Sequence, residues 1–317
     1  MTGTGGLFRR KAERGQPVRN TRSTRSERLV HAFWASLVAL AMAAAMFLEP
    51  VDWMIWAVQS RIADQPPSGE IVYVQADSNV ADAGASARRE QLAEALDQMR
   101  LAGVKRVYLD IVFPKLRPSA GDARLDAALD RWGADVAVVN RIDTSIGGNR
   151  TEVRNQASFA ADRRTVWMGF ASSWPNFAWR LPYNYRTRDG QAPSLAADIA
   201  GMVEHEEPSF EVEYSTRSHR IPSLRLADLL PNGSRVAASQ LAGKIVVVGT
   251  PRDPAFPDLT VPVQVSTPPS FVAIHAAETL KRGPPRFVSG VGAIMALVAV
   301  LGLGAFANSF LLRRIAY

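Results

Sequence analysis

The chain contains no cysteine among its 317 residues. Disulfide bonds, thiolate catalysis and cysteine-ligated zinc sites are therefore excluded. Its four histidines are scattered and show no spacing typical of a metal site. The motifs GxSxG, GxxxxGK[ST] and HExxH, and SxxK with its partner motifs, are also absent. The sequence thus predicts a protein that is not an enzyme and that holds neither a cofactor nor a metal ion.

Charge is nearly absent from two long apolar stretches. Residues 29–48 contain one ionisable side chain, His31, and residues 287–312 contain no charge. As helices they would be about 30 and 39 Å long, enough to cross a hydrocarbon core of about 30 Å. We therefore expect two transmembrane helices. A cleaved signal peptide ending near Ala43-Ala44-Ala45 is the alternative for the first, but the long basic region and long apolar run favour an uncleaved anchor.

The net charge of +7 lies at the two ends of the chain rather than in its middle. Residues 1–28 carry a net charge of +6, Arg313 and Arg314 lie in the last segment, and residues 62–286 are neutral overall. A basic excess that flanks apolar spans marks cytoplasmic segments, so no nucleic-acid partner is predicted. We expect both termini in the cytoplasm of a bacterium, contact of the basic arm with membrane lipids, and the main domain outside the inner (plasma) membrane.

The expected organisation follows from these spans. Pro50 is expected to kink or end the first helix, and Trp53 and Trp56 suit the outer membrane interface. In chain order we expect a basic cytoplasmic arm (1–28), a transmembrane helix (29–48), an interfacial linker (49–67), an extracytoplasmic domain (68–283), a second transmembrane helix (287–312) and a short cytoplasmic tail (313–317).

Strand-like and helix-like runs alternate in the outer domain. Strands are predicted at IVYVQAD from Ile71, RVYLDIVF from Arg106 and DVAVVN from Asp135, with helices from about Arg88 and around Leu125 between them. This alternation predicts an α/β fold, with a largely parallel central sheet flanked by helices and inserted between the two spans.

The later part of the domain contains the most apolar strand. The run KIVVVG at 244–249 predicts a fully buried central strand, and 271–283 predicts a helix that leads towards the second span. Further predictions are a long loop at 144–164, a strand from Thr165, a helix at 194–204, an edge strand at FEVEYS (210–215) and a short helix at LADLLP (226–231).

Ligands of parallel sheets bind beyond the carboxyl ends of the strands. Several polar residues and one glycine are predicted there or in the adjacent loop and helix. The alternative is structural: Asp77 and Asp253 cap turns or helices, backbone donors hold Asp110, and His275 forms a local pair with Glu278 or packs on the sheet. The candidate ligand-binding residues are Asp77, Asp110, Gly249, Thr250, Asp253, Asp258 and His275.

Aromatic and basic side chains gather in the segment 174–188, a composition typical of protein interfaces. The alternative is that these aromatics only cover one edge of the core. The candidate interface residues are Trp174, Phe177, Trp179, Arg180, Tyr183 and Tyr185.

Five stretches, in order, resemble one known family: IVYVQADSN, AGVKRVYLDIVF, IPSLRLADLL, LAGKIVVVGT and AIHAAETLKRG. The family is that of the type-two CHASE domains, extracellular sensory modules of bacterial cyclases, histidine kinases and related receptors. The resemblance covers Ser68 to Gly283 and implies a periplasmic or extracellular α/β ligand-sensing domain. The chain departs from the family pattern at WPNFAWRLP and at Glu213-Tyr214. With the last predicted span ending five residues before Tyr317, no catalytic output domain of the kind common in the family is expected.

Two functions are therefore expected. The first is a non-enzymatic sensory protein that signals or docks through its transmembrane helices to a separate membrane or cytoplasmic protein, with a small-molecule ligand as one input. The alternative is a structural subunit of a larger membrane complex, whose outer domain docks a protein partner.

Overall fold

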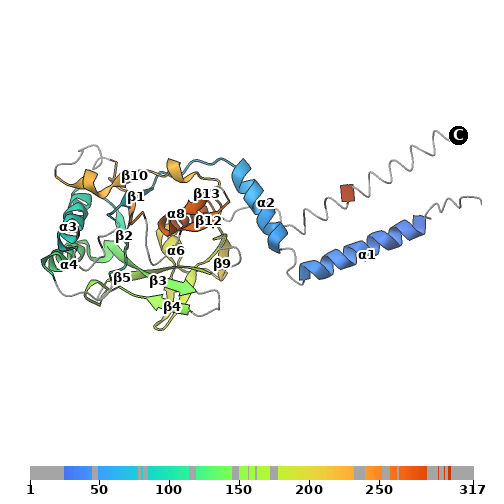
Figure 1. Cartoon of the computed structure of the whole chain (residues 1–317), viewed down its shortest axis with the longest axis horizontal. Coiled ribbons are helices and arrows are strands. Elements are labelled where there is room, and N and C mark those ends of the chain that lie inside the picture. The colour runs from blue at the N-terminus through green and yellow to red at the C-terminus, as the bar shows by residue number, and fades with distance from the viewer. Residues whose placement is uncertain are drawn as a thin grey trace, which may run out of the picture. The chain divides into compact units, whose positions relative to one another are not determined.

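A computed structural model of the chain (Figure 1) describes most of the predicted outer domain. The chain divides into two compact units, Met1–Glu49 with Val291–Tyr317, and Pro50–Gly290. The described residues are 25–44, 49–77, 80, 85–113, 119–144, 150–155, 157–160, 163–171, 178–231, 240–251, 258–262, 264–283, 292, 296, 299 and 300.

The described part of the first unit consists mainly of helix α1 (Arg25–Ala44). Large apolar side chains of this helix, such as Leu29 and Phe33, are exposed. Among the described residues, no helix combines the length and hydropathy that a bilayer span requires. The predicted span 29–48 is therefore helical as far as Ala44, and most of the predicted span 287–312 lies outside the described residues.

A seven-stranded, mostly parallel sheet forms the centre of the second unit. Its strand order is β10-β1-β11-β2-β3-β4, with β5 pairing β3 as well, and only β4 runs antiparallel. The predicted parallel sheet is thus confirmed. Its strands are β1 (Ile71–Gln75), β2 (Arg106–Asp110), β3 (Val136–Thr144), β4 (Arg150–Val153), β5 (Arg164–Ala171), β10 (Ser223–Arg225) and β11 (Ile245–Gly249).

Strand β11 is the central strand that the sequence predicted. All five of its residues are buried, and it pairs in parallel with β1 on one side and β2 on the other. An uninterrupted apolar run suits this position because both faces of the strand are covered. Val246 and Val248 face one apolar core, and Ile245 and Val247 face the other.

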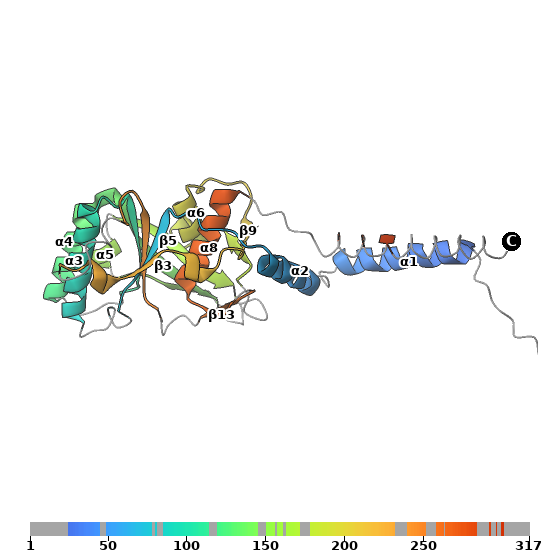
Figure 2. The ribbon, with the colours of Figure 1, turned by 90° about the horizontal axis from the view of Figure 1, so that it is seen from above.

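Helices cover both faces of the sheet (Figure 2). Helices α3 (Ser86–Leu101) and α4 (Ala120–Trp132) lie on one face. Helices α6 (Leu195–Ala200) and α8 (Pro269–Arg282) lie on the other. Helix α4 begins at a capping box, in which Ser119 and Asp122 satisfy each other's backbone N–H groups. The result is a three-layer α/β/α domain.

The region between β3 and β10 adds detail to its prediction and departs from it in one segment. The segment predicted as a long loop at 144–164 contains β4 and the short helix α5 (Ala157–Ala160). The FEVEYS segment forms β9 (Ser209–Glu211), which pairs with β6 (Arg180–Pro182) outside the main sheet, because Phe210 lies opposite Leu181 and both are buried. The remaining strands are β7 (Asn184–Thr187), β8 (Gly190–Pro193), β12 (Leu259–Val261) and β13 (Gln264–Thr267), and short 3₁₀ helices lie at Gly133–Asp135, Ser218–Arg220 and Leu226–Leu229.

Helix α2 (Glu49–Ile62) belongs to the folded domain, which corrects the expectation for Trp56. Trp56 is 2% exposed, and its indole Nε1 donates a hydrogen bond to the carbonyl of Val212 at 2.9 Å. Its ring also packs edge-on against Trp179 and Tyr214. Trp56 is therefore a core residue rather than a membrane-interface residue, and the compact unit starts well before residue 68. Pro50 lies in the first turn, where a missing N–H removes no intrahelical bond.

Candidate functional site

Helix α8 connects two polar clusters that arise from distant parts of the chain. Its first turn lies at the carboxyl edge of the sheet, and its later turns contact the segment 63–70 that leads from α2 into β1. We call the first the sheet-edge cluster (Tyr73, Asp110, Arg141, Gly249 and Ser270). We call the second the junction (Gln65, Ser68, Glu70, Glu213, Thr216, Glu278, Thr279, Lys281 and Arg282).

Asp110, the last residue of β2, is the centre of the sheet-edge cluster. Its carboxylate accepts a hydrogen bond from Nη2 of Arg141 at 2.8 Å and one from the Ser270 hydroxyl at 2.5 Å. Asp110, Arg141 and Ser270 are all almost fully buried. A buried carboxylate needs such partners, because desolvation strongly disfavours an unpaired charge. The pair Asp110–Arg141 therefore ties β2 to β3, and the Ser270 contact ties α8 to both.

Gly249 and Tyr73 are the two remaining residues of the sheet-edge cluster. A Cβ atom on Gly249 would lie 2.5 Å from the Ser270 Oγ atom and 3.1 Å from Cε2 of Tyr73, so the absent side chain lets α8 approach the sheet. The Tyr73 ring lies 4.6 Å from the Phe271 ring. Burial, reinforced by the Asp110 carboxylate, raises the pKa of Tyr73 above its ordinary value, so its hydroxyl stays neutral.

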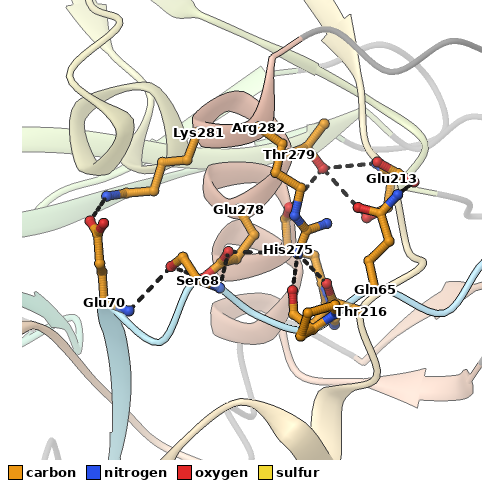
Figure 3. A network of polar contacts seen from close by, with 11 residues as sticks. Gln65, Ser68, Glu70, Glu213, Thr216, His275, Glu278, Thr279, Lys281 and Arg282 are labelled. Carbon is orange, nitrogen blue, oxygen red and sulfur yellow. Dashed lines mark hydrogen bonds and ion pairs between the residues drawn. The ribbon is translucent and has the colours of Figure 1, made fainter.

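The junction joins the segment before β1 to the last turns of α8 (Figure 3). Ser68 donates from its backbone N–H to Glu278 Oε2 at 2.9 Å and from its hydroxyl to Glu278 Oε1 at 2.7 Å. Two residues along, Glu70 pairs with Lys281. The hydrogen bond from Lys281 lowers the pKa of the Glu70 carboxyl.

Arg282 and Thr279 extend the junction to a third segment. Arg282 Nη2 donates to the Pro66 carbonyl at 2.9 Å and also to the Thr216 hydroxyl, and it lies 3.7 Å from Glu278. The Thr279 hydroxyl accepts a hydrogen bond from the backbone N–H of Glu213 at 2.9 Å.

Gln65 completes this arrangement. Its side-chain amide donates to the Glu213 carboxylate at 3.1 Å, and its backbone N–H donates to the Ser215 carbonyl at 3.3 Å. Helix α8, the segment 63–70 and the segment 213–216 are thus bonded to one another in a closed ring of contacts (Figure 3).

His275 lies between the two clusters on α8 and is fully buried. Its Nε2 atom lies 3.0 Å from the Ser218 hydroxyl, and its ring centre lies 5.3 Å from that of Tyr214. Burial, and secondarily the charge of Arg282, lowers the pKa of His275 to about 3. His275 is therefore a neutral core residue at neutral pH. It lies five residues beyond Ser270, about 7.5 Å along the helix axis, and is not part of the sheet-edge cluster.

Among the predicted ligand-binding residues that the structure describes, only Asp110 and Gly249 belong to one cluster. Asp77 is exposed and pairs with Arg88 Nε at 3.1 Å. Asp258 is exposed and accepts a hydrogen bond from the Ser266 hydroxyl. Thr250 is half-buried beside the end of β11, and Asp253 lies outside the described residues. The structural alternative for Asp110 was wrong in one respect, since the side chains of Arg141 and Ser270 hold its carboxylate.

The predicted aromatic interface divides between core and surface. Tyr183 is buried, and Tyr185 is half-buried. The Tyr185 hydroxyl accepts a hydrogen bond from the backbone N–H of Gly169 and donates one to the carbonyl of the same residue. Trp179 is half-buried, packs on Trp56, and lies under the guanidinium of Arg180, which also pairs with Glu211. Tyr183, Tyr185 and Trp179 thus pack at one edge of the core, and their role as an interface stays a prediction. Trp174 and Phe177 lie outside the described residues.

Sequence reasoning missed most of the polar partners. Arg141 carried a usable signal, because a lone charge in the apolar run VAVVNRI predicts a buried pair with a carboxylate such as Asp110. Ser270 and Ser68 carried none, since a serine beside a proline is common in loops and at helix starts.

Comparison with known proteins gives one match. The CHASE2 domain family matches residues 32–306, which is most of the chain. No curated protein and no solved structure matches the sequence. CHASE2 domains are sensory domains of signalling proteins and are typically extracellular. The chain, with its α/β/α body and the polar clusters on α8, belongs to the CHASE2 domain family.

Proposed function

We propose that this protein is a non-enzymatic, membrane-anchored sensory protein whose CHASE2 domain reports an input by moving α8 against the segment 63–70. The observation that carries the proposal is the junction. The segment 63–70 follows α2, which itself follows the first predicted span, and α8 precedes the second predicted span. A shift between them would reach the first span through α2 and the second span through the residues after α8.

Helix α8 suits the role of transmitter because it contacts both clusters. Its 14 residues form a rod of about 21 Å. The hydroxyl of Ser270 in its first turn bonds Asp110, and Arg282 at its last turn bonds Pro66. A ligand or partner that changes the carboxyl edge of the sheet would displace the start of α8. Since α8 is one continuous helix, its last turn would move as well.

The input must bind more tightly to one of two positions of α8 relative to the segment 63–70. A ligand with equal affinity for both positions would shift no equilibrium between them. We propose that a separate membrane or cytoplasmic protein reads the displacement. The domain would lie outside the plasma membrane, with both termini in the cytoplasm, as the distribution of basic residues indicates.

The proposal is tested in two steps. The full chain, purified from its native membrane, is expected to carry a stoichiometric partner, and a cytoplasmic reporter fused after Tyr317 is expected to be active. The junction is then locked by a disulfide between the variants Ser68→Cys and Glu278→Cys, which is selective because the chain has no other cysteine.

With the disulfide formed, the activity of the partner is expected to stay at one level whatever the input. Reduction of the disulfide is expected to restore the response of the partner to the input. The matched control is Arg131→Cys with Asp97→Cys, a pair that joins α3 and α4 away from the junction. If the partner binds the locked and the reduced protein equally well, and its activity does not change with the disulfide, the result would contradict signalling and support the docking-subunit alternative. Absence of any partner would contradict both.

A further inference from the structure

Helix α2 presents two opposite apolar faces, of which the domain uses one. Trp56, Ala57 and Ser60 are buried against the body of the domain. Met54, Val58 and Ile62, spaced four residues apart, are 55%, 48% and 78% exposed. Residues at this spacing lie along one side of a helix. We call these three side chains the α2 stripe.

The orientation of the α2 stripe is fixed by contacts of other residues of the helix with the domain. Besides the bond from Trp56 to Val212, Arg61 Nε donates to the Pro262 carbonyl at 2.7 Å. The carbonyl of Arg61 in turn accepts a hydrogen bond from Arg217 at 2.7 Å. Helix α2 is therefore attached to the domain at Trp56 and at Arg61, and the α2 stripe cannot rotate inward to hide its apolar surface.

Position in the chain identifies what covers the α2 stripe. Helix α2 begins at Glu49, the residue that follows the predicted span 29–48. If that span crosses the bilayer, α2 must start at the membrane surface. Apolar side chains on one face of a helix at that level, with Asp52 and Arg61 on its flanks, are typical of interfacial helices.

A second copy of the chain fits the α2 stripe less well. Stable protein interfaces bury about 800 Å² on each partner, and three side chains offer much less. A bilayer contact needs no such area, because the tether already holds α2 at the surface and supplies a high effective concentration.

We propose that the α2 stripe lies in the interfacial layer of the bilayer and so sets the orientation of the CHASE2 domain on the membrane. This inference rests on the membrane attachment proposed above. Helix α2 carries Glu49, Asp52 and Arg61, a net charge of −1. Anionic lipids would therefore not strengthen the contact, and neutral and anionic bilayers should bind the stripe equally.

The absence of cysteine permits a direct test with single-cysteine variants of the full chain. Met54→Cys, Val58→Cys and Ile62→Cys are labelled with a small fluorophore and reconstituted into vesicles of phosphatidylcholine brominated near the head group. Leu101→Cys, an exposed apolar position at the end of α3, is the aqueous control. Leu37→Cys in α1, with deeply brominated lipid, reports whether the first span is inserted.

We expect the labels at all three stripe positions to be quenched at least twofold more than the label at Leu101. The same result is expected in vesicles of phosphatidylcholine and of phosphatidylglycerol, each brominated near the head group. If the Leu37 label is quenched and the stripe labels behave like Leu101, the inference is wrong although the span is real. If the Leu37 label is not quenched, membrane attachment itself fails. Excimer emission from pyrene at Val58→Cys, without lipid quenching, would assign the α2 stripe to a second copy and overturn the inference.

Discussion

The carboxylate of Glu278 accepts hydrogen bonds from both donors of Ser68, a residue 210 positions earlier in the chain. One bond comes from the backbone N–H and the other from the hydroxyl, so each carboxylate oxygen receives one. Glu278 is 1% exposed, and Arg282 lies on the following turn of the same helix. This contact joins the segment that leads into β1 to helix α8.

The first prediction concerns this pair. Glu278→Gln replaces one accepting oxygen by an NH₂ group that faces a Ser68 donor, so the free energy of unfolding should fall by about 1–3 kcal/mol. Ser68→Ala, which removes one bond, should cost about 1 kcal/mol. The double variant should cost less than the sum, because both changes disrupt one contact. Denaturant unfolding of the detergent-solubilised protein measures each value.

The matched control for this prediction is Glu94→Gln, which affects the exposed pair with Arg124. Its effect should stay within about 0.5 kcal/mol. Strict additivity of the Ser68 and Glu278 variants would show that the two side chains do not act together.

The second prediction compares two aspartates at the carboxyl edge of the sheet. Asp110→Ala leaves the buried guanidinium of Arg141 without its carboxylate, and the loss of stability should be about 3–5 kcal/mol. Asp77→Ala removes an exposed ion pair with Arg88 and should cost at most about 1 kcal/mol. Thermal unfolding followed by circular dichroism distinguishes them, and equal losses would argue against a buried ionic anchor at β2.

The third prediction concerns the close approach of α8 to Gly249. Gly249→Ala places a methyl group against the Ser270 hydroxyl, which is held by Asp110 and cannot turn away freely. The variant should lose about 1–3 kcal/mol. In a Ser270→Ala background the same change should cost less, because the nearest obstructing atom is gone. A penalty that is unchanged by Ser270→Ala would place the obstruction elsewhere.

The fourth prediction is a pH dependence from His275. Its folded-state pKa of about 3 lies below the ordinary value of 6.5, so between these values the unfolded chain binds the extra proton. Stability from this residue is complete above pH 6.5 and falls as the pH decreases towards 3, with a limiting slope of about 1.4 kcal/mol per pH unit.

His275→Gln, which keeps a polar group near Ser218 but does not titrate, should flatten this slope. Unfolding midpoints measured from pH 7 to pH 5, where few carboxylates titrate, isolate the effect. His219, on the exposed 3₁₀ turn nearby, provides the control as His219→Gln, which should leave the slope unchanged. A wild-type slope that survives in the His275 variant would assign the dependence to another group.

The layers of the fold were predictable because their signals are local. The apolar run of β11 and the three- and four-residue spacing in α4 each specify an element without reference to the rest of the chain. Strand β9 was predicted as an edge strand without a partner, since alternation of Phe210 and its neighbours fixes a strand but not the strand it pairs with. Trp56 was misassigned for a related reason, because an interfacial tryptophan and a core tryptophan look alike in sequence.

The candidate site was predictable only in part. Asp110 and Gly249 were identified because parallel sheets place strand ends together. Their partner Ser270 is 160 residues from Asp110, and Ser68 is 210 residues from Glu278. Contacts over such separations depend on how the layers pack, and no local pattern encodes them.

The strand order carries a consequence for how the protein is made. β1 and β2 are separate early strands that never pair with each other, and each pairs instead with β11, which is synthesised about 140 to 170 residues later. The pairings of β11 with β1 and β2 must therefore wait until residues 245–249 leave the ribosome, although β2 can pair earlier with β3 and β1 with β10. Such non-local pairing slows folding. Nascent chains that stop before Ile245 should be degraded readily, whereas those extending past α8 should resist proteases.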